Sequence, residues 1–442
     1  MTIRMDEGAA ELLHALHAAG HAAYAVGGCV RDSLLGLTPH DWDLCTSALP
    51  QQVMELFGAQ RCIPTGLQHG TVTVKQSGAL YEITTFRTEG TYTDGRHPDE
   101  VHFVPDVRQD LARRDFTINA MAYNEKEGLV DPFGGQADLQ SGIVRAVGVP
   151  RQRFTEDALR ILRLYRFAAR FGFAIDLPTA QAAQELCAHL DCVSVERIEE
   201  ELAKLLAAPA PAAYLDEKIL LVILPELTSE ALAAAKPVVD ACPAGAENLP
   251  IRLAALLYSL GEDGTRRTLK RLRCSNALIE EAAVLVREVV SGVPVAFSSD
   301  TNRAIPSPAL LPAATGSHPS GRSSEKLPAR PPVSLNIYTR KLLGQYGLKT
   351  VQRIAALGTA LQPKRAADFA ALSELAEQLD ADGVCCRVSQ LAVNGRDLMA
   401  AGVPAGPGIR KVLEALLDGV IREEYPNERQ ALLAAAQQLA AS

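Results

Sequence analysis

The sequence lacks the marks of several classes of protein. No apolar run of about 18 residues free of charges occurs, so the sequence predicts no membrane-spanning helix. The start, MTIRMDEGAAELLHALHAAG, carries acids and histidines where a secretory signal would be basic and then apolar, so we expect a cytoplasmic protein. Nine scattered cysteines with no CxxC pair disfavour a zinc site and a disulfide framework. A net charge of -8 excludes a surface that binds nucleic acid throughout, but leaves room for a local basic patch.

Two patterns of hydrophobicity divide the 442 residues near position 148. The first part alternates helical segments with short runs rich in β-branched residues, which predicts an α+β fold. The second part is rich in Leu and Ala at three-to-four spacing, which predicts helices throughout. The expected strands are 22–28, 41–47, 70–75, 80–86 and 101–105, and the clearest expected helices are 157–172, 197–208, 251–261 and 408–421.

One stretch, from about residue 291 to 334, has neither pattern. It is rich in Ser, Pro and Gly and has no apolar period, which is typical of a flexible linker. Structureless segments of this length are uncommon inside compact domains, so we place a domain boundary here.

The first group of residues with chemical meaning is a glycine pair followed by two acids. Gly27 and Gly28 end an expected strand and precede a short helix, so backbone N–H groups there can face a phosphate, although such pairs also serve simple turns. Asp41 and Asp43 lie two apart on the next expected strand and would project from one face. Two adjacent carboxylates repel unless a cation lies between them, and oxygen ligands beside phosphates favour Mg²⁺. The alternative is one turn-capping and one solvated aspartate.

Two further sequence segments carry weaker signals. Glu82 alternates with apolar residues on a neighbouring expected strand, where it could reach the same metal or form the polar face of an edge strand. The run from Arg113 to Ala120 is expected on a helix. There the arginines suit phosphate or planar polar groups and Asp115 could orient one of them, but such a pair of arginines is also common on solvated surfaces.

The third group lies at the start of the 157–172 helix, which we expect Thr155 to cap. Asp157 and Arg160 are three apart, as in an ordinary surface ion pair. A carboxylate can also accept a hydrogen bond from the amino group of cytosine or adenine while a guanidinium donates to the bare ring nitrogen beside it. Such a pair would refuse uracil and guanine. Arg163, Arg166 and Arg170 continue the helix as a basic stripe that could follow a nucleic-acid backbone or form a solvated face.

Together these segments resemble the family of class II tRNA nucleotidyltransferases and bacterial poly(A) polymerases, within the nucleotidyltransferase superfamily that includes DNA polymerase β. The similarity is carried by GGCVRD, DWD, TGLQHGTVTV, EITTFRTEGTYTDGRHPDEVHFV, DLARRDFTINAMAYN, DPFGG and EDALRILRLYRFAARFGF, which occur in the family's order over about the first 175 residues.

The resemblance implies a head with a small mixed sheet and a polymerase β-like palm, followed by an all-α neck, body and tail. The corresponding divisions are a head at 1–148, a neck with the base template at 149–210, a body at 211–290, the linker at 291–334 and a tRNA-binding tail at 335–442. It also implies that residues 87–104 form a loop involved in switching from C to A addition.

The resemblance further implies roles for individual residues. Gly27, Gly28 and Arg31 would hold the triphosphate, and Asp41 and Asp43 would bind Mg²⁺. Arg114 and Asp115 would hold the sugar and base of the nucleotide. Asp157 and Arg160, assisted by Arg163, would select C and then A.

The implied activity is transfer of C, C and A from CTP and ATP to the 3′ end of tRNA without a nucleic-acid template. Enzymes that add only the terminal A, and poly(A) polymerases, share these motifs and remain alternatives. A non-catalytic RNA-binding member is a further alternative, which the intact Asp41 and Asp43 disfavour.

Overall fold

The computed structural model describes residues 3–90, 101–292 and 335–441. Its contacts divide the chain into two compact units. The first unit comprises Met1–Leu232, Ala244–Ala246 and Arg271–Cys274, and the second comprises Ala233–Pro243, Glu247–Lys270 and Ser275–Ser442.

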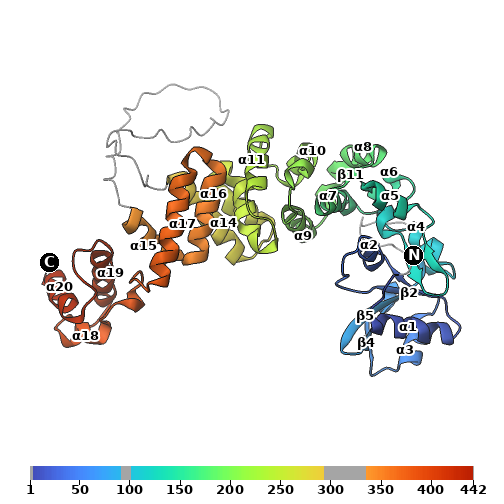
Figure 1. The fold of residues 1–442 in the computed structure, drawn as a ribbon, viewed down its shortest axis with the longest axis horizontal. Coiled ribbons are helices and arrows are strands. Elements are labelled where there is room, and N and C mark those ends of the chain that lie inside the picture. Colours follow the sequence, from blue (N-terminus) through green and yellow to red (C-terminus); the bar gives the residue numbers. More distant parts are fainter. Residues whose placement is uncertain (1–2, 91–100, 293–334, 442) are drawn as a thin grey trace. The chain divides into compact units, whose positions relative to one another are not determined.

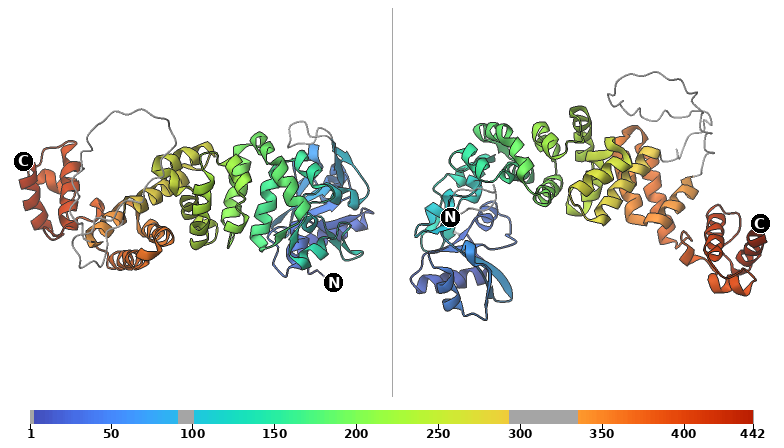
Figure 2. Two further views of the ribbon diagram at one scale, coloured as in Figure 1. Left: turned by 90° about the horizontal axis from the view of Figure 1, so that it is seen from above. Right: turned by 180° about the vertical axis from the view of Figure 1, so that it is seen from behind.

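A mixed sheet forms the framework of the first unit (Figures 1 and 2). The strand order is β3-β4-β5-β2-β1-β8-β9; β2 and β5 are parallel, and the other neighbours are antiparallel. The β-branched and aromatic residues of β4 and β5 favour the extended backbone of this long pair. The strands are β1 (Ala23–Val26), β2 (Leu44–Thr46), β3 (Cys62–Gly66), β4 (Thr71–Gln76), β5 (Ala79–Thr85), β8 (Ala122–Asn124) and β9 (Gly128–Val130).

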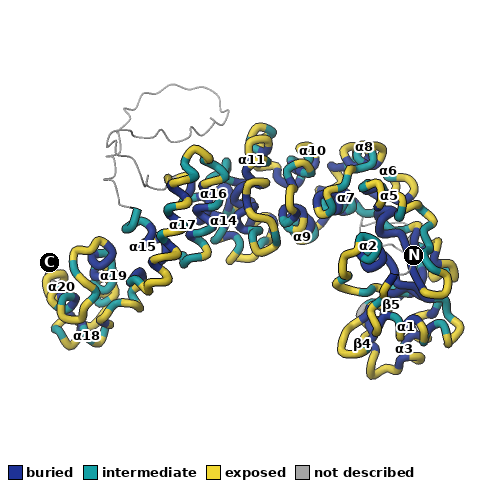
Figure 3. The backbone as a smooth tube through the Cα atoms, viewed as in Figure 1, coloured by how far each residue is buried: buried dark blue, intermediate teal, exposed yellow. Residues whose placement is uncertain are grey.

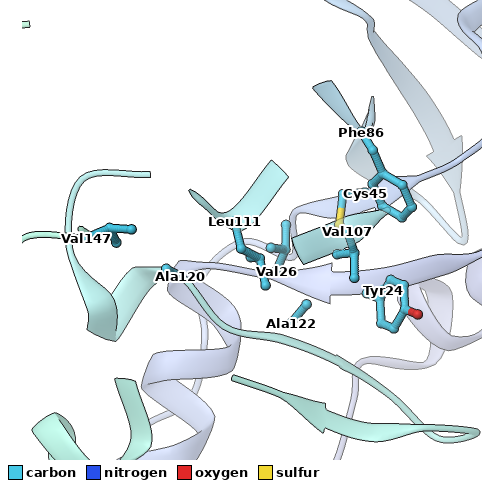
Figure 4. Close-up of a cluster of buried hydrophobic side chains, with 9 residues drawn as sticks. All are labelled: Tyr24, Val26, Cys45, Phe86, Val107, Leu111, Ala120, Ala122 and Val147. Atoms are coloured by element: carbon cyan, nitrogen blue, oxygen red, sulfur yellow. The ribbon is translucent and has the colours of Figure 1, made fainter. Parts of the chain in front are cut away.

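Helices pack on this sheet and close its core. α1 (Glu7–Ala18) packs against β1 and β2, and α3 (Pro50–Phe57) packs against β4 and β5. α4 (Val107–Ala112) contributes two side chains to an apolar cluster with residues of β1, β2 and β8. Figure 4 shows the members of this cluster, Tyr24, Val26, Cys45, Phe86, Val107, Leu111, Ala120, Ala122 and Val147. The cluster fixes the ends of β1 and β2, where the sequence places the glycine pair and the acids.

Smaller elements complete the sheet region. β6 (Arg87–Glu89) and β7 (Val101–Phe103) form an antiparallel hairpin, and β10 (Ile143–Val144) pairs in parallel with β11 (Ala174–Ile175). The short helices are α2 (Gly28–Leu34), α5 (Gly135–Ser141) and the 3-10 helices η1 (Leu67–His69) and η2 (Thr117–Asn119).

The rest of the first unit is helical. α7 carries leucines and aromatics on one face, which pack mainly against α9, while α6 packs against α8. The elements are α6 (Pro150–Glu156), α7 (Leu159–Phe171), α8 (Leu177–Leu186), η3 (Cys187–Cys192), α9 (Val195–Leu206), η4 (Ala212–Tyr214) and α10 (Glu217–Ile223), and α11 (Ser229–Ala241) spans both units.

The second unit is helical throughout its described residues. Its helices bury their apolar faces against one another (Figure 3). The elements are η5 (Ala246–Asn248), α12 (Leu249–Leu257), η6 (Tyr258–Leu260), α13 (Gly261–Arg271), α14 (Asn276–Ser291), α15 (Leu335–Tyr346), α16 (Leu348–Leu361), η7 (Pro363–Arg365), α17 (Ala366–Ala381), η8 (Val388–Gln390), α18 (Gly395–Ala400), α19 (Gly408–Ile421) and α20 (Arg429–Ala441). None of the helices in the described ranges is long and apolar enough to cross a membrane.

The expected fold class, an α+β head followed by helices, is confirmed. The five-part division of the chain stays a prediction. Helix α16, which follows the expected linker, packs against α12 and α14, which precede it. Residues 293–334 of that linker and 91–100 of the expected loop lie outside the described residues. The nine cysteines are all unpaired; seven are buried, Cys274 is half-buried and Cys192 is exposed.

Candidate active site

The glycine pair lies where the sequence predicts it, between the end of β1 and the start of α2. Gly27 has φ of 78°, a conformation that side chains rarely adopt. A Cβ on Gly27 would also come within 2.8 Å of Nη1 of Arg114. The positive φ favours glycine, and the second observation shows that an arginine from a distant segment lies against the turn.

Asp41 and Asp43 precede β2 instead of lying on it, so their expected place on a strand is wrong. The reason is that β1 ends at Val26 and the chain turns at Gly27, which leaves Asp41 no backbone to pair with. Asp43, directly before β2, still hydrogen-bonds to β1, because its carbonyl accepts a 2.9 Å hydrogen bond from the amide of Val26. The two acids therefore lie on an open segment facing the glycine turn.

A cavity of about 430 Å³ joins these parts. Its lining brings the cradle and both acids together with the end of α7. The lining residues are Gly28, Cys29, Arg31, Asp32, Leu37, Thr38, His40, Asp41, Asp43 and Arg170. Asp32, His40 and Arg170 are additions to the expected triphosphate site. Asp32 stands in the GGCVRD motif, and Arg170 was expected in the basic stripe of the 157–172 helix.

Negative charge is concentrated beside this cavity. Partial desolvation raises the pKa of Asp43, and the nearby charges of Glu82 and Asp41 raise it further, while Arg114 opposes them. Burial also raises the pKa of the Cys29 thiol to about 11, so this lining residue is neutral near pH 7. A dication between the carboxylates would relieve their repulsion.

The donors present suit Mg²⁺. Among the residues that the structure describes, no three or more His, Cys, Asp or Glu side chains form a complete metal site. Mg²⁺ commonly takes one or two protein carboxylates and completes its shell with water and substrate phosphates, so Asp41 and Asp43 fit it. Glu82 acts on Asp43 electrostatically, and its role as a third ligand stays a prediction.

The segment after α4 holds two arginines through a carboxylate that sequence reasoning missed. The run from Arg113 is not on a helix, because α4 ends at Ala112 and the chain turns into η2. Buried Asp110 accepts a 3.0 Å hydrogen bond from Nε of Arg113 and lies 3.6 Å from Nη2 of Arg114. Its position one helical turn before the arginines was the available signal.

Asp115 pairs with α7 and not with its neighbouring arginines. Its Oδ2 accepts from Nε and Nη2 of Arg163 at 2.9 and 2.7 Å. Burial alone would raise the pKa of Asp115, but Arg163 and Asn119 outweigh it and hold that pKa well below its usual range. Nη1 of Arg163 also lies 3.6 Å from Glu201 of α9, which pairs with Nε of Arg166 at 2.5 Å.

These contacts form one continuous network of ion pairs and hydrogen bonds. Asn119 donates to Asp115 at 3.1 Å and accepts from Nη1 of Arg31 at 2.6 Å. Helix α7 is thereby connected to the glycine turn. In order, the members are Arg166, Glu201, Arg163, Asp115, Asn119, Arg31, Asp32 and Arg170.

Asp157 and Arg160 do not pair with each other. Asp157 follows α6 with extended backbone, and its Oδ1 accepts from the amide of Leu159, so it caps α7. The expected cap, Thr155, is wrong, because it lies inside α6. Oδ2 of Asp157 accepts from Arg197 at 2.8 Å.

Arg160 is held separately. Its Nη1 donates to Glu156 at 2.7 Å, and its Nη2 donates to the carbonyl of Arg113 at 3.1 Å. Both members of the proposed base-reading pair are therefore positioned by other residues. This arrangement leaves their remaining donors and acceptors for a ligand.

The fold and this site together define a nucleotidyltransferase. The family model described as the poly A polymerase head domain matches residues 23–145, and a model of tRNA nucleotidyltransferase domain 2 matches residues 336–436. A further model, described as the probable RNA- and SrmB-binding site of polymerase A, matches residues 172–230.

Similarity over the full length of the chain identifies the family within the nucleotidyltransferases. The CCA-adding enzyme of Lactiplantibacillus plantarum is 34% identical over 99% of this chain and 97% of its own. That of Geobacillus stearothermophilus is 34% identical over 94% of this chain and 92% of its own. The crystal structure of the Bacillus stearothermophilus CCA-adding enzyme in complex with CTP superposes with a TM-score of 0.76 at 30% identity, covering 99% and 98% of the two chains. The chain belongs to the family of CCA-adding enzymes, which carry a poly(A) polymerase head domain.

A more distant structure shares the fold. The Thermotoga maritima CCA-adding enzyme complexed with tRNA_CCA has a TM-score of 0.65 at 19% identity and covers 99% of this chain and 97% of its own. The family resemblance expected from the sequence motifs is thus confirmed, while the roles of individual residues stay predictions.

Proposed function

We propose that this protein adds C, C and A to the 3′ end of tRNA from CTP and ATP, using the cavity beside Asp41 and Asp43. The observation that carries the proposal is the convergence of a glycine cradle, two carboxylates and an arginine on one cavity in a CCA-adding enzyme fold. Cytoplasmic location belongs to the same proposal, because tRNA, CTP and ATP are cytoplasmic molecules.

The cradle binds the triphosphate. Gly27 and Gly28 leave the start of α2 open to an anion, and Arg31 fixes the orientation of that turn through Asn119. Arg114 lies against the turn and reaches the nucleotide's sugar side, while Asp110 holds its guanidinium in place.

Asp41 and Asp43 bind Mg²⁺. When bound, the metal supplies charge neutralisation for the phosphates and lowers the pKa of the attacking 3′-hydroxyl. Both carboxylates lie on the segment before β2, and the positive charge of Arg114 partly offsets the electrostatic repulsion at Asp43. No covalent enzyme intermediate is required, because positioning and electrostatics carry phosphoryl-type transfer.

Asp157 and Arg160 select the base. Asp157 accepts from the exocyclic amine and Arg160 donates to the ring nitrogen of cytosine or adenine. Arg197 and Glu156 hold the two side chains, so a wrong base meets fixed partners and leaves them unpaired. Arg163 positions Asp115 on the same side of α7, and Arg166 supports the helix through Glu201.

The test is incorporation by the purified protein with Mg²⁺, with CTP and ATP offered separately and together. Three primers are compared: tRNA lacking CCA, tRNA ending in CC, and an unrelated oligoribonucleotide. Addition of C, C and A to the first primer followed by a stop supports the proposal. Action only on the CC-ended tRNA would identify an A-adding enzyme, and long A tails on the unrelated RNA would identify a poly(A) polymerase.

A further inference from the structure

We propose that Arg170, in the last turn of α7, binds the terminal phosphates of the incoming nucleoside triphosphate. This inference rests on the proposed function, because it assumes that the cavity beside Asp41 and Asp43 takes such a nucleotide. The residue acts by direct contact with the phosphates and not through the base-selecting pair.

The balance of charge in the cavity requires a cation at this end. Three carboxylates, Asp32, Asp41 and Asp43, line it, against the two guanidinium groups of Arg31 and Arg170. Two of the carboxylates suit a metal, but Asp32 lies beside the cradle. A ligand with several negative charges that enters beside Asp32 needs N–H donors there that can turn toward it.

Arg31 is already committed to other partners. Its side chain is 5% exposed, and its Nε and Nη2 lie 2.8 and 2.7 Å from Oδ1 of Asp32. Nη1 donates to Asn119 at 2.6 Å. Its guanidinium lies 5.2 and 5.0 Å from the ring centres of Phe167 and Phe171. Burial lowers the pKa of Arg31 and Asp32 opposes this, so the group is a fixed charge behind the cradle.

Arg170 is held far more loosely in the same cavity. Its side chain is 47% exposed, and its Nη2 donates to Oδ2 of Asp32 at 3.3 Å, a long hydrogen bond for a charged pair. The ring of Phe171, 5.0 Å from the guanidinium, supports it from α7. An arginine with one long bond to a carboxylate retains donors for a phosphate and can exchange one partner for the other.

The other arginines of α7 are placed differently. Arg163 and Arg166 point to Asp115 and Glu201, and neither lines the cavity. Arg170 is therefore placed to contact the triphosphate, which CTP and ATP share, and not the base, in which they differ. Its loss should weaken both nucleotides alike and leave the choice of base unchanged.

The test measures equilibrium binding of CTP, ATP and CMP to the full chain with Mg²⁺ and without tRNA. Arg170→Gln is expected to weaken the affinity for CTP and ATP by roughly tenfold to a hundredfold, the range for a lost charge-assisted hydrogen bond. The affinity for CMP should not change. Arg170→Lys should restore a large part of the loss. Lys204→Gln is the matched control, because Lys204 is 49% exposed and pairs with one carboxylate, Glu200, outside the cavity lining.

Competition by pyrophosphate gives a second readout. The affinity for pyrophosphate should weaken in parallel with the affinity for CTP. Equal weakening of CMP and CTP would mean that Arg170 acts only by supporting the fold, and unchanged CTP binding would overturn the inference. Arg170→Ala replaces the glutamine variant if the latter does not fold. Because binding is measured without turnover, a wild-type protein that binds CTP but adds nothing to tRNA would overturn the proposed function and not the role of Arg170.

Discussion

Asp115 and Glu201 of the first unit are buried, and both pair with Arg163, whereas the pairs Arg410–Glu414 and Arg422–Asp418 of α19 lie in water. The two regions use the same residue types, arginine with aspartate or glutamate, in different surroundings. Buried charges must be partnered, because an unpaired one is costly, so each side chain of the network around Asp115 fixes the direction of the next. Solvated pairs on a helix impose little geometry. A site that must distinguish nucleotides needs the first arrangement.

The largest expected effect is a loss of nucleotide incorporation by the first unit, while tRNA binding by the second unit is retained. Asp41→Ala and Asp43→Ala should each lower incorporation by at least about a hundredfold, because the Mg²⁺ site loses half of its carboxylates. Binding of tRNA should remain, since the tail is expected to carry much of it. Incorporation assays and filter binding with the same preparations check both statements, and retained turnover would remove the metal assignment.

Asp115→Ala tests the cost of unpairing a buried charge. The variant leaves Arg163 with only the longer 3.6 Å contact to Glu201 and leaves Asn119 without its acceptor, and we expect a loss of about 3 kcal/mol in unfolding free energy. Arg163 is 33% exposed, which places the effect at the low end of the usual range. Urea unfolding measures it, and a loss below about 1 kcal/mol would contradict the role given to this network.

Arg160→Ala tests selectivity separately from stability. Without the guanidinium, the penalty for a wrong base should fall by about 1 to 3 kcal/mol, so UTP or GTP should be incorporated more readily relative to CTP and ATP. The measurement is the ratio of kcat/KM for correct and incorrect nucleotides. Arg273→Ala, at an exposed arginine paired with Glu196, is the control. Unchanged selectivity in the Arg160 variant would rule out its part in base reading.

The smallest effect is expected in α19. Glu414→Ala removes a surface i,i+4 pair in which Arg410 is 86% exposed, and stability should change by less than about 0.5 kcal/mol. Urea unfolding at low and high salt checks this value. A loss similar to that of Asp115→Ala would remove the distinction between the two regions.

Much of the site was predictable because its parts are local. The strand, glycine turn and short helix at Gly27–Gly28 follow from backbone preferences, and the acids at 41 and 43 follow from their improbable position beside an apolar strand. The errors concern element ends. Thr155 lies inside α6 and Asp157 caps α7, because a break between two helices is not visible in a continuous helical pattern.

The partners of the charged residues were not predictable. Asp115 has two arginines immediately before it, yet it pairs with Arg163, 48 residues away. Glu201 and Arg197 carry no local signal that separates them from ordinary surface charges. Which carboxylate meets which guanidinium depends on the packing of α4, α7 and α9, and pairing patterns at short spacing do not contain that information.

The sequence by itself determined the class of fold, the family and the residues with chemical potential, because these depend on local conformation, hydrophobic period and the order of motifs along the chain. The tertiary structure decided which of those residues meet. The packing of α7 brings Arg163 to Asp115 and Arg170 to Asp32, so that α7 and the glycine turn share one network of ion pairs and hydrogen bonds. Burial made this possible, because charges removed from water bind strongly to a partner and hold a fixed geometry.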